Sequence, residues 1–146
     1  SNLYSNGKVC LSLLGTAGSS GEESARWNPE TTSLVQVLMS IQAMVLVEEP
    51  LSNHPGFEGL KGTAAFKHQS AAFNQELQLH TVRLAMVALL RSPPIGFEEV
   101  VEAHFLHKRE AVRSQCLQWL RSASADVRAP LGSAVQQLFE LLDRLG

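Results

Sequence analysis

The sequence predicts a mainly α-helical protein, and three observations support this fold class. Four stretches of its 146 residues carry apolar side chains three and four positions apart, which is the period of an α-helix. Alternation of apolar and polar residues with a period of two, typical of a half-buried strand, is confined to a short run around Cys10. Prolines and glycines separate the helical stretches, and both residue types interrupt helices.

The composition excludes several classes of protein. Apolar residues make up 45% of the chain and charged residues 18%, which is ordinary for a globular domain with a sizeable core. The net charge is −2 and the basic residues are scattered, so we expect no nucleic-acid partner and no membrane partner. Cys10 and Cys116 lie in unrelated contexts, which indicates no disulfide framework and favours an intracellular setting, cytoplasmic or nuclear.

The first helix is predicted after a small, polar, glycine-rich surface loop at residues 15–30. Thr31, Thr32 or Ser33 can cap its N-terminus, because a hydroxyl oxygen accepts a hydrogen bond from a backbone amide of the first turn. Residues 34–46 are apolar over most of the helix circumference, a pattern typical of a buried helix. Pro50 is expected to end it.

Three more helices are predicted after a second loop at residues 50–69. The second helix spans about 70–91, and the third runs from about Phe97 to Leu120 with an interruption near 106–109. A serine- and alanine-rich linker at 122–130 then divides the chain into residues 1–122 and 123–146. The last helix carries a stripe of apolar residues, Leu131, Val135, Leu138, Leu142 and Leu145. This stripe either packs on this domain or offers a surface to a partner helix.

A motif around Cys10 carries the functional prediction. Residues 2–14 read Asn-Leu-Tyr-Ser-Asn-Gly-Lys-Val-Cys-Leu-Ser-Leu-Leu, in which Asn6-Gly7 is a turn signal. This segment resembles the active site of the ubiquitin-conjugating enzymes, where a His-Pro-Asn motif is followed eight residues later by the catalytic cysteine. Asn2 takes the asparagine position and Cys10 that of the nucleophile. Ser1 stands in place of the proline, and the histidine is absent.

The resemblance continues through Leu-Leu-Gly-Thr at 13–16, Arg-Trp-Asn-Pro at 26–29, Gln-Val-Leu-x-Ser-Ile-Gln at 36–42 and Glu-Pro-x-x-Asn-x-Pro-Gly at 49–56. It is greatest to the large hybrid enzymes that combine conjugating and ligase activity. It implies the C-terminal half of an α+β ubiquitin-conjugating fold, with the active-site segment and following helices but without the N-terminal helix and antiparallel sheet. The chain opens inside a motif and lacks an initiator methionine, so we interpret it as a fragment.

The resemblance also implies a reaction and its partners. Cys10 would accept ubiquitin as a thioester from the ubiquitin-activating enzyme and pass it to a lysine of a protein substrate; no cofactor and no metal are implied. Asn2 would donate its amide to the oxyanion, although an asparagine there can instead order the turn. His54 stands where the family has a carboxylate and would desolvate or orient the lysine; the alternative is an exposed loop histidine. Ala17 replaces a tryptophan that is usual in the hybrid enzymes.

Two further readings of the chain stay open. It can be a catalytically inactive helical interaction module derived from the same fold, or a purely structural helical domain in which Cys10 is incidental. Cys116, Trp27 and Trp119 are predicted core residues. His104 and His107 are three residues apart on a helix, and we expect them to be solvated because no third ligand follows at a suitable spacing. If nothing covers the apolar helix at 34–46, the isolated chain should be marginally stable and prone to aggregate.

Overall fold

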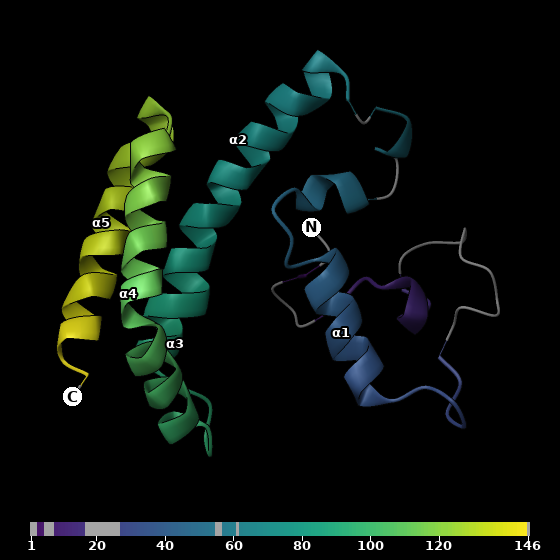
Figure 1. Ribbon diagram of the computed structural model, residues 1–146, viewed down its shortest axis with the longest axis horizontal. Helices are drawn as coiled ribbons and strands as arrows, with labels where there is room; N and C mark the ends of the chain where they lie inside the picture. The colour runs from purple at the N-terminus through teal and green to yellow at the C-terminus, as the bar shows by residue number, and fades with distance from the viewer. Residues whose placement is uncertain (1–2, 5–7, 17–26, 55–56, 61, 146) are drawn as a thin grey trace. The chain divides into compact units, whose positions relative to one another are not determined.

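The computed structural model describes residues 3–4, 8–16, 27–54, 57–60 and 62–145, and these residues are mostly helical (Figure 1). In the described part of the chain, β-structure is limited to one antiparallel bridge between Leu3 and Val9. The prediction of a mainly α fold class is therefore confirmed. The chain divides into two compact units, Ser1–Asn74 and Gln75–Gly146, and each is described by itself.

The first unit contains the 3-10 helices η1 (Ser12–Leu14), η3 (Pro50–Asn53) and η4 (Glu58–Leu60) and the α-helix α1 (Leu34–Met44). Ser33 caps α1, as one of the three predicted candidates. Its Oγ accepts the Gln36 amide at 3.4 Å, and the Gln36 side chain accepts the Ser33 amide at 2.7 Å, which completes a capping box. The helix ends well before Pro50, because the Asn53 side-chain amide donates to the Met44 carbonyl at 2.9 Å and satisfies the last turn.

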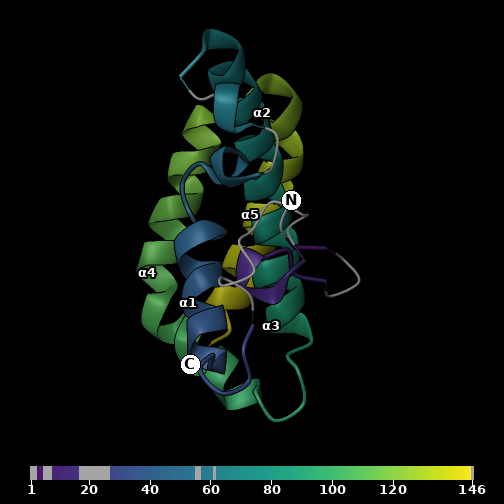
Figure 2. The same cartoon turned by 90° about the vertical axis from the view of Figure 1, so that its right-hand side faces the viewer.

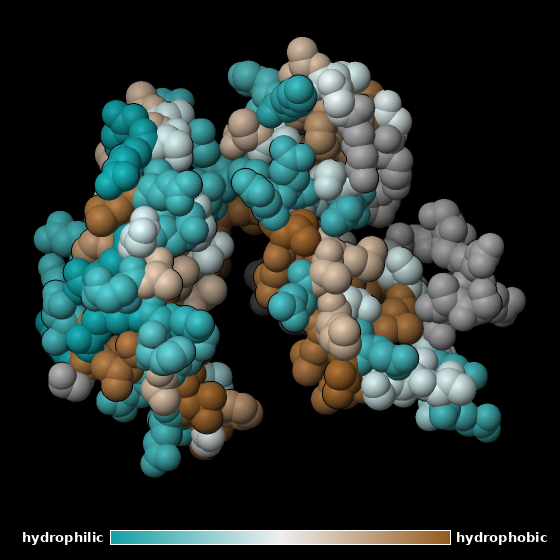
Figure 3. All heavy atoms as spheres, in the orientation of Figure 1, coloured by the Kyte–Doolittle hydropathy of each residue, from teal (hydrophilic) through white to brown (hydrophobic). Residues whose placement is uncertain are grey.

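The prediction that α1 is buried over most of its circumference is wrong. Val37 is its one buried residue, whereas Leu34, Val35, Leu38 and Met39 are each more than half exposed. The physical reason is that α1 packs against the short helix η1, which is too small to cover more than one side. Figure 3 shows the apolar surface that this leaves along α1. Trp27, predicted to anchor a core, is also exposed.

One continuous helical rod follows, formed by α2 (Ala64–His80), the π-helix η5 (Thr81–Ala88) and α3 (Leu89–Arg91). It ends at the predicted residue but starts six residues earlier than predicted. Thr63 accounts for the early start, since its Oγ1 accepts the Phe66 amide at 3.2 Å and its carbonyl accepts the Lys67 amide at 3.1 Å.

In the second unit, α4 (Glu98–Ser122) and α5 (Ala125–Asp143) lie beside η5 and α3 (Figures 1 and 2). The predicted interruption near 106–109 is wrong: α4 is continuous there, Phe105 is buried, and Arg109 donates to the Leu145 carbonyl at the end of α5. The predicted linker is shorter, because Ser124 already accepts the Arg128 amide at 2.9 Å and starts α5. Pro130 lies inside α5, where its ring leaves one carbonyl of the first turns without an amide donor.

The core of this unit confirms several predictions. Cys116 is fully buried, and Trp119 packs against the same cluster. The apolar stripe of α5 packs on this unit rather than standing free, with Leu131, Leu138 and Leu142 at 0% exposure. The division of the chain at residues 122 and 123 stays a prediction.

Candidate active site

The segment that carries Cys10 is held by an antiparallel pairing. Leu3 and Val9 form the bridge, and the Tyr4 amide donates to the Lys8 carbonyl at 3.0 Å. Residues that face each other across such a pairing have side chains on the same face, and successive residues alternate between the two faces. Tyr4 and Lys8 therefore share one face. Cys10, two positions after Lys8, is expected on that face too.

Thr16 closes the turn that follows the cysteine. Its hydroxyl donates to the Val9 carbonyl at 2.6 Å and accepts the Leu11 amide at 3.0 Å, while its own amide donates to the Leu11 carbonyl at 3.2 Å. The Cys10 Sγ in turn donates to the Thr16 carbonyl at 3.2 Å. These bonds join both sides of the cysteine to one residue and fix the direction of its side chain.

The turn itself is η1, with Gly15 at its C-terminal end. Gly15 has φ of 66°, in the left-handed region where a side chain is disfavoured, and its amide donates to the Ser12 carbonyl at 2.9 Å. Leu11, next to the cysteine, is 2% exposed and anchors the segment. Cys10 is partly exposed, so a segment anchored by Leu11 presents a thiol that a reagent can approach.

Tyr4 is the side chain in direct contact with the thiol. The Cys10 side chain raises the pKa of the Tyr4 phenol above its ordinary value, first through a hydrogen bond and then through charge, with a smaller contribution from desolvation. The Lys8 Nζ lies 5.7 Å from the centroid of the same ring, as a cation–π contact. Tyr4 thus touches both the cysteine and the lysine.

The sequence-predicted site residues are only partly described. Asn2, the turn at Asn6-Gly7 and Ala17 lie outside the described residues. His54 is at the end of η3, half-buried, where its amide donates to the Leu51 carbonyl and its ring meets the edge of Phe57 at 5.9 Å. Its predicted action on a lysine stays a prediction.

Sequence reasoning missed three residues of this site: Tyr4, Lys8 and Thr16. For the first two a partial signal was present, since a turn at Asn6-Gly7 brings the residues on either side of it together. A two-residue turn there would place Tyr4 opposite Val9, however, and the observed bridge places Tyr4 opposite Lys8. Thr16 had no local signal, because its hydrogen bonds depend on how residues 11–15 fold back.

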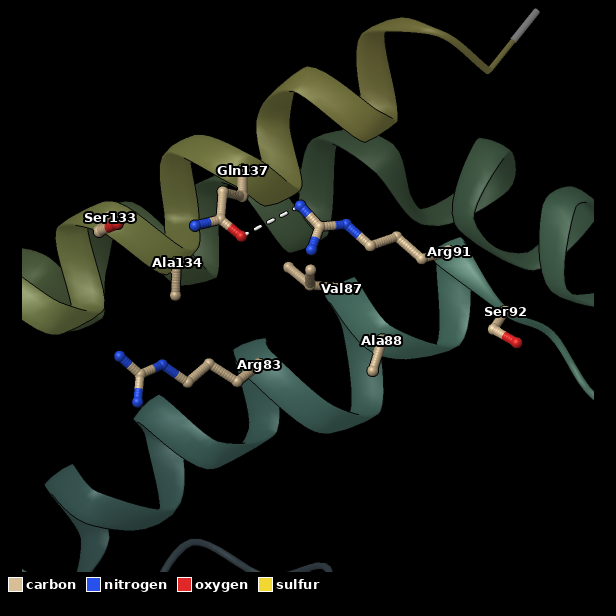
Figure 4. A pocket seen from close by; sticks show the side chains of 8 residues that line it. All are labelled: Arg83, Val87, Ala88, Arg91, Ser92, Ser133, Ala134 and Gln137. Carbon is tan, nitrogen blue, oxygen red and sulfur yellow. Dashed lines mark hydrogen bonds between the residues drawn. The ribbon is translucent and has the colours of Figure 1, made fainter.

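The second unit has a groove of its own, with a volume of about 440 Å³, between η5–α3 and α5 (Figure 4). Val87 and Ala134 form its apolar floor, and Arg83 and Arg91 lie along one rim, with Arg91 donating to the Gln137 side chain at 3.2 Å. Cysteine and histidine are missing from its lining. Its lining includes the hydroxyl side chains of Ser92 and Ser133, whereas the nucleophile predicted from the sequence, Cys10, belongs to the first unit.

Two kinds of feature, metal-binding clusters and membrane-spanning helices, were sought in the described residues. They contain no group of three or more His, Cys, Asp or Glu side chains that could hold a metal ion, and His104 and His107 are both exposed on α4. Among the described helices, none has both the length and the apolarity needed to cross a bilayer.

Comparison with known proteins identifies what the chain is similar to. No family model matches it. A probable ubiquitin-conjugating enzyme of Acanthamoeba polyphaga mimivirus is 37% identical over 99% of the chain and 10% of the viral protein. The human dual E2 ubiquitin-conjugating enzyme/E3 ubiquitin-protein ligase BIRC6 is 42% identical over 82% of the chain and 2% of BIRC6. A probable ubiquitin-conjugating enzyme of Caenorhabditis elegans is 42% identical over 86% of the chain and 17% of its own length. The chain thus spans a small part of these relatives.

Proposed function

The chain belongs to the ubiquitin-conjugating enzyme family, and from this premise we propose that it carries the transfer site of such an enzyme. Cys10 accepts ubiquitin as a thioester from the ubiquitin-activating enzyme and passes it to a lysine of a protein substrate. The single observation that carries the proposal is the local architecture of Cys10: a partly exposed thiol on a hydrogen-bonded turn, within a chain whose relatives are named for this activity.

The chemistry needs one good nucleophile that is also a good leaving group, and a cysteine thiolate is both. In the first step the Cys10 sulfur attacks the thioester carbonyl of ubiquitin, a new C–S bond forms, and the thiolate of the activating enzyme leaves. In the second step a substrate amine attacks the same carbonyl. The C–N bond forms, the C–S bond breaks, Cys10 leaves as a thiolate, and the amine proton passes to solvent.

The other site residues act on the second step. Asn2 donates its side-chain amide to the carbonyl oxygen as negative charge develops there. His54 desolvates or orients the incoming lysine. An intracellular setting, cytoplasmic or nuclear, fits this chemistry, because the thiol must stay reduced between cycles.

The experiment is a charging assay with activating enzyme, ATP and ubiquitin, read on a non-reducing gel. It is run on this chain and on a longer protein that contains it, each with a Cys10→Ala variant and a matched Cys116→Ala variant. The proposal predicts an adduct that reductant removes, that Cys10→Ala abolishes and that Cys116→Ala leaves intact. Absence of the adduct from both proteins refutes the proposal and favours the inactive interaction module.

A further inference from the structure

The groove of the second unit combines a basic rim with an apolar floor (Figure 4). Val87 and Ala134 form the floor, and the described lining contains no Asp or Glu side chain to balance the two arginines of the rim. Arg91 donates to the neutral side chain of Gln137 at 3.2 Å, and Arg83 forms no ion pair with a described residue. Both guanidinium charges are therefore available to an anionic partner.

The wall that carries both arginines also has an uncommon backbone conformation. Arg83 and Val87 belong to η5, a π-helix whose hydrogen bonds join residues five apart, and Arg91 ends α3. Stretches of π-helix are rare, and they are frequently found at functional sites. This observation distinguishes the groove from the ordinary α-helical surface of the same unit.

A second surface with no covering lies a few residues further along the chain, between α3 and the start of α4. Two large apolar side chains there, Ile95 and Phe97, are 96% and 58% exposed. Glu98 and Glu99 follow directly, and both are exposed. Exposed apolar residues that are bordered by charged ones are typical of an interaction site. Residues 95–99 are called the acidic tip below.

The acidic tip is stabilised by a turn of its own. The Pro94 carbonyl accepts the Phe97 amide at 2.9 Å, and Gly96, at the third position of this turn, has the positive φ of 84° that such a turn requires. The rings of Pro93 and Pro94 fix φ at the two preceding positions. A segment that is ordered before it binds loses little conformational entropy on binding.

We propose that the acidic tip of one copy of this chain binds the groove of a second copy, and that the chain forms a homodimer through its second unit. Ile95 and Phe97 of one copy pack on the apolar floor of the other. Glu98 and Glu99 pair with the two arginines of the rim. The two surfaces therefore match both in charge and in polarity.

The positions of the two surfaces favour a closed dimer. The groove and the acidic tip belong to the same unit, and Arg91 at the end of the groove is close in sequence to Ile95. A two-fold axis lets each copy place its tip in the groove of the other, so that the same contact forms twice. This inference does not depend on the proposed function, because neither surface includes Cys10.

Charge reversal tests the pairing directly. A groove variant carries Arg83→Glu and Arg91→Glu, and a tip variant carries Glu98→Arg and Glu99→Arg. All four side chains are exposed, so the substitutions leave the core of the unit intact. Within each variant, like charges face each other across the proposed interface. In an equimolar mixture of the two variants, both contacts of a mixed dimer again pair opposite charges.

Two more variants separate charge from apolar contact. Lys108→Glu with Arg121→Glu makes the same change of net charge as the groove variant, at exposed positions of α4 outside both surfaces. Ile95→Ser keeps every charge and removes an apolar side chain that contributes little to the fold, since it is 96% exposed.

The measurement is sedimentation velocity of the full chain at micromolar to millimolar concentration. We expect the parent chain to dimerise, and the groove and tip variants each to raise the dissociation constant about tenfold or more, because like charges oppose each other. The equimolar mixture should recover the dissociation constant of the parent, and the α4 control should match the parent. Ile95→Ser should weaken the dimer about tenfold.

Three outcomes overturn the inference. A parent chain that stays monomeric throughout leaves the groove to an acidic segment of another protein. Equal association of the parent, groove and tip variants assigns self-association to another surface, such as the exposed apolar residues of α1. A mixture that associates no better than its two components shows that the tip and the groove do not meet. In each case the charging assay of Cys10 keeps its own result.

Discussion

Replacement of Thr16 by valine should release the turn that follows Cys10 while keeping the shape of the side chain. The Thr16 hydroxyl donates to the Val9 carbonyl at 2.6 Å and accepts the Leu11 amide at 3.0 Å, and valine can do neither. Each hydrogen bond contributes about 0.5–1.5 kcal/mol. Because Thr16 is exposed and water can replace part of the loss, we expect a local cost of about 1–2 kcal/mol.

The assay is amide hydrogen exchange at Leu11, whose N–H loses its acceptor. A cost of about 1–2 kcal/mol corresponds to exchange about 5–30 times faster than in the parent chain. Thr16→Ser is the matched control, since it removes only a methyl group and keeps the hydroxyl. Equal exchange rates at Leu11 in the valine and serine variants would refute the reasoning that the hydroxyl holds this turn.

Three further predictions concern the rest of the chain. Burial raises the pKa of the Cys116 thiol to about 11, so the folded chain holds that proton more tightly than the unfolded chain. The stability that this thiol contributes is present below about pH 9 and declines as the pH rises toward 11. Urea unfolding at stepped pH should therefore show a smaller decline in the free energy of unfolding for Cys116→Ala than for the parent chain. Gly132→Ala should stabilise the chain by about 0.5–1 kcal/mol, because a Cβ there meets only Leu120 at 3.9 Å. Gly96→Ala should destabilise it by about 1–2 kcal/mol in the same urea titration, because φ of +84° at this position disfavours any residue with a Cβ. Leu38→Lys and Met39→Lys should lower self-association in sedimentation velocity, since they break the exposed apolar surface of α1; a Thr31→Lys control that lowered it equally would show that net charge alone is responsible.

The local sequence was enough to predict where the first helix begins and which residues form the apolar stripe of the last helix. The first helix begins after Ser33, which is one of the three hydroxyl residues that the sequence offers as its cap. For the last helix the apolar spacing predicts the stripe and leaves open whether it packs on this domain or faces a partner helix. In the structure Leu131, Leu138 and Leu142 are buried within their own unit. These predictions succeeded because each depends on residues within a few positions of one another.

The wrong predictions depended on partners elsewhere in the chain. The apolar circumference of α1 is necessary for burial, but burial also requires a surface to pack against, and η1 covers only one side. The linker predicted at 122–130 places the last helix after Pro130, yet α5 starts after Ser124 and contains the proline with the loss of one hydrogen bond. The helix α4 continues past Arg109, whose side chain donates to the Leu145 carbonyl 36 residues away, a contact that local sequence does not predict.

In the candidate site, too, part could be predicted from the local sequence and part depends on contacts between residues that are further apart. The family motif singled out Cys10, whereas the groups that hold and touch its thiol, Thr16 and Tyr4, follow from the turn and the bridge. The roles of Asn2 and His54 rest on the family motif and stay predictions.

The most direct test of the central claim is to exchange one atom, sulfur for oxygen, at residue 10. Cys10→Ser, charged with activating enzyme, ATP and ubiquitin, should give an oxyester that survives reductant and is cleaved by base, with mass spectrometry locating ubiquitin on residue 10. The parent chain should give a thioester at the same residue that reductant removes. An adduct of unchanged chemistry in Cys10→Ser, or one located at any other residue, would contradict the assignment of Cys10 as the nucleophile.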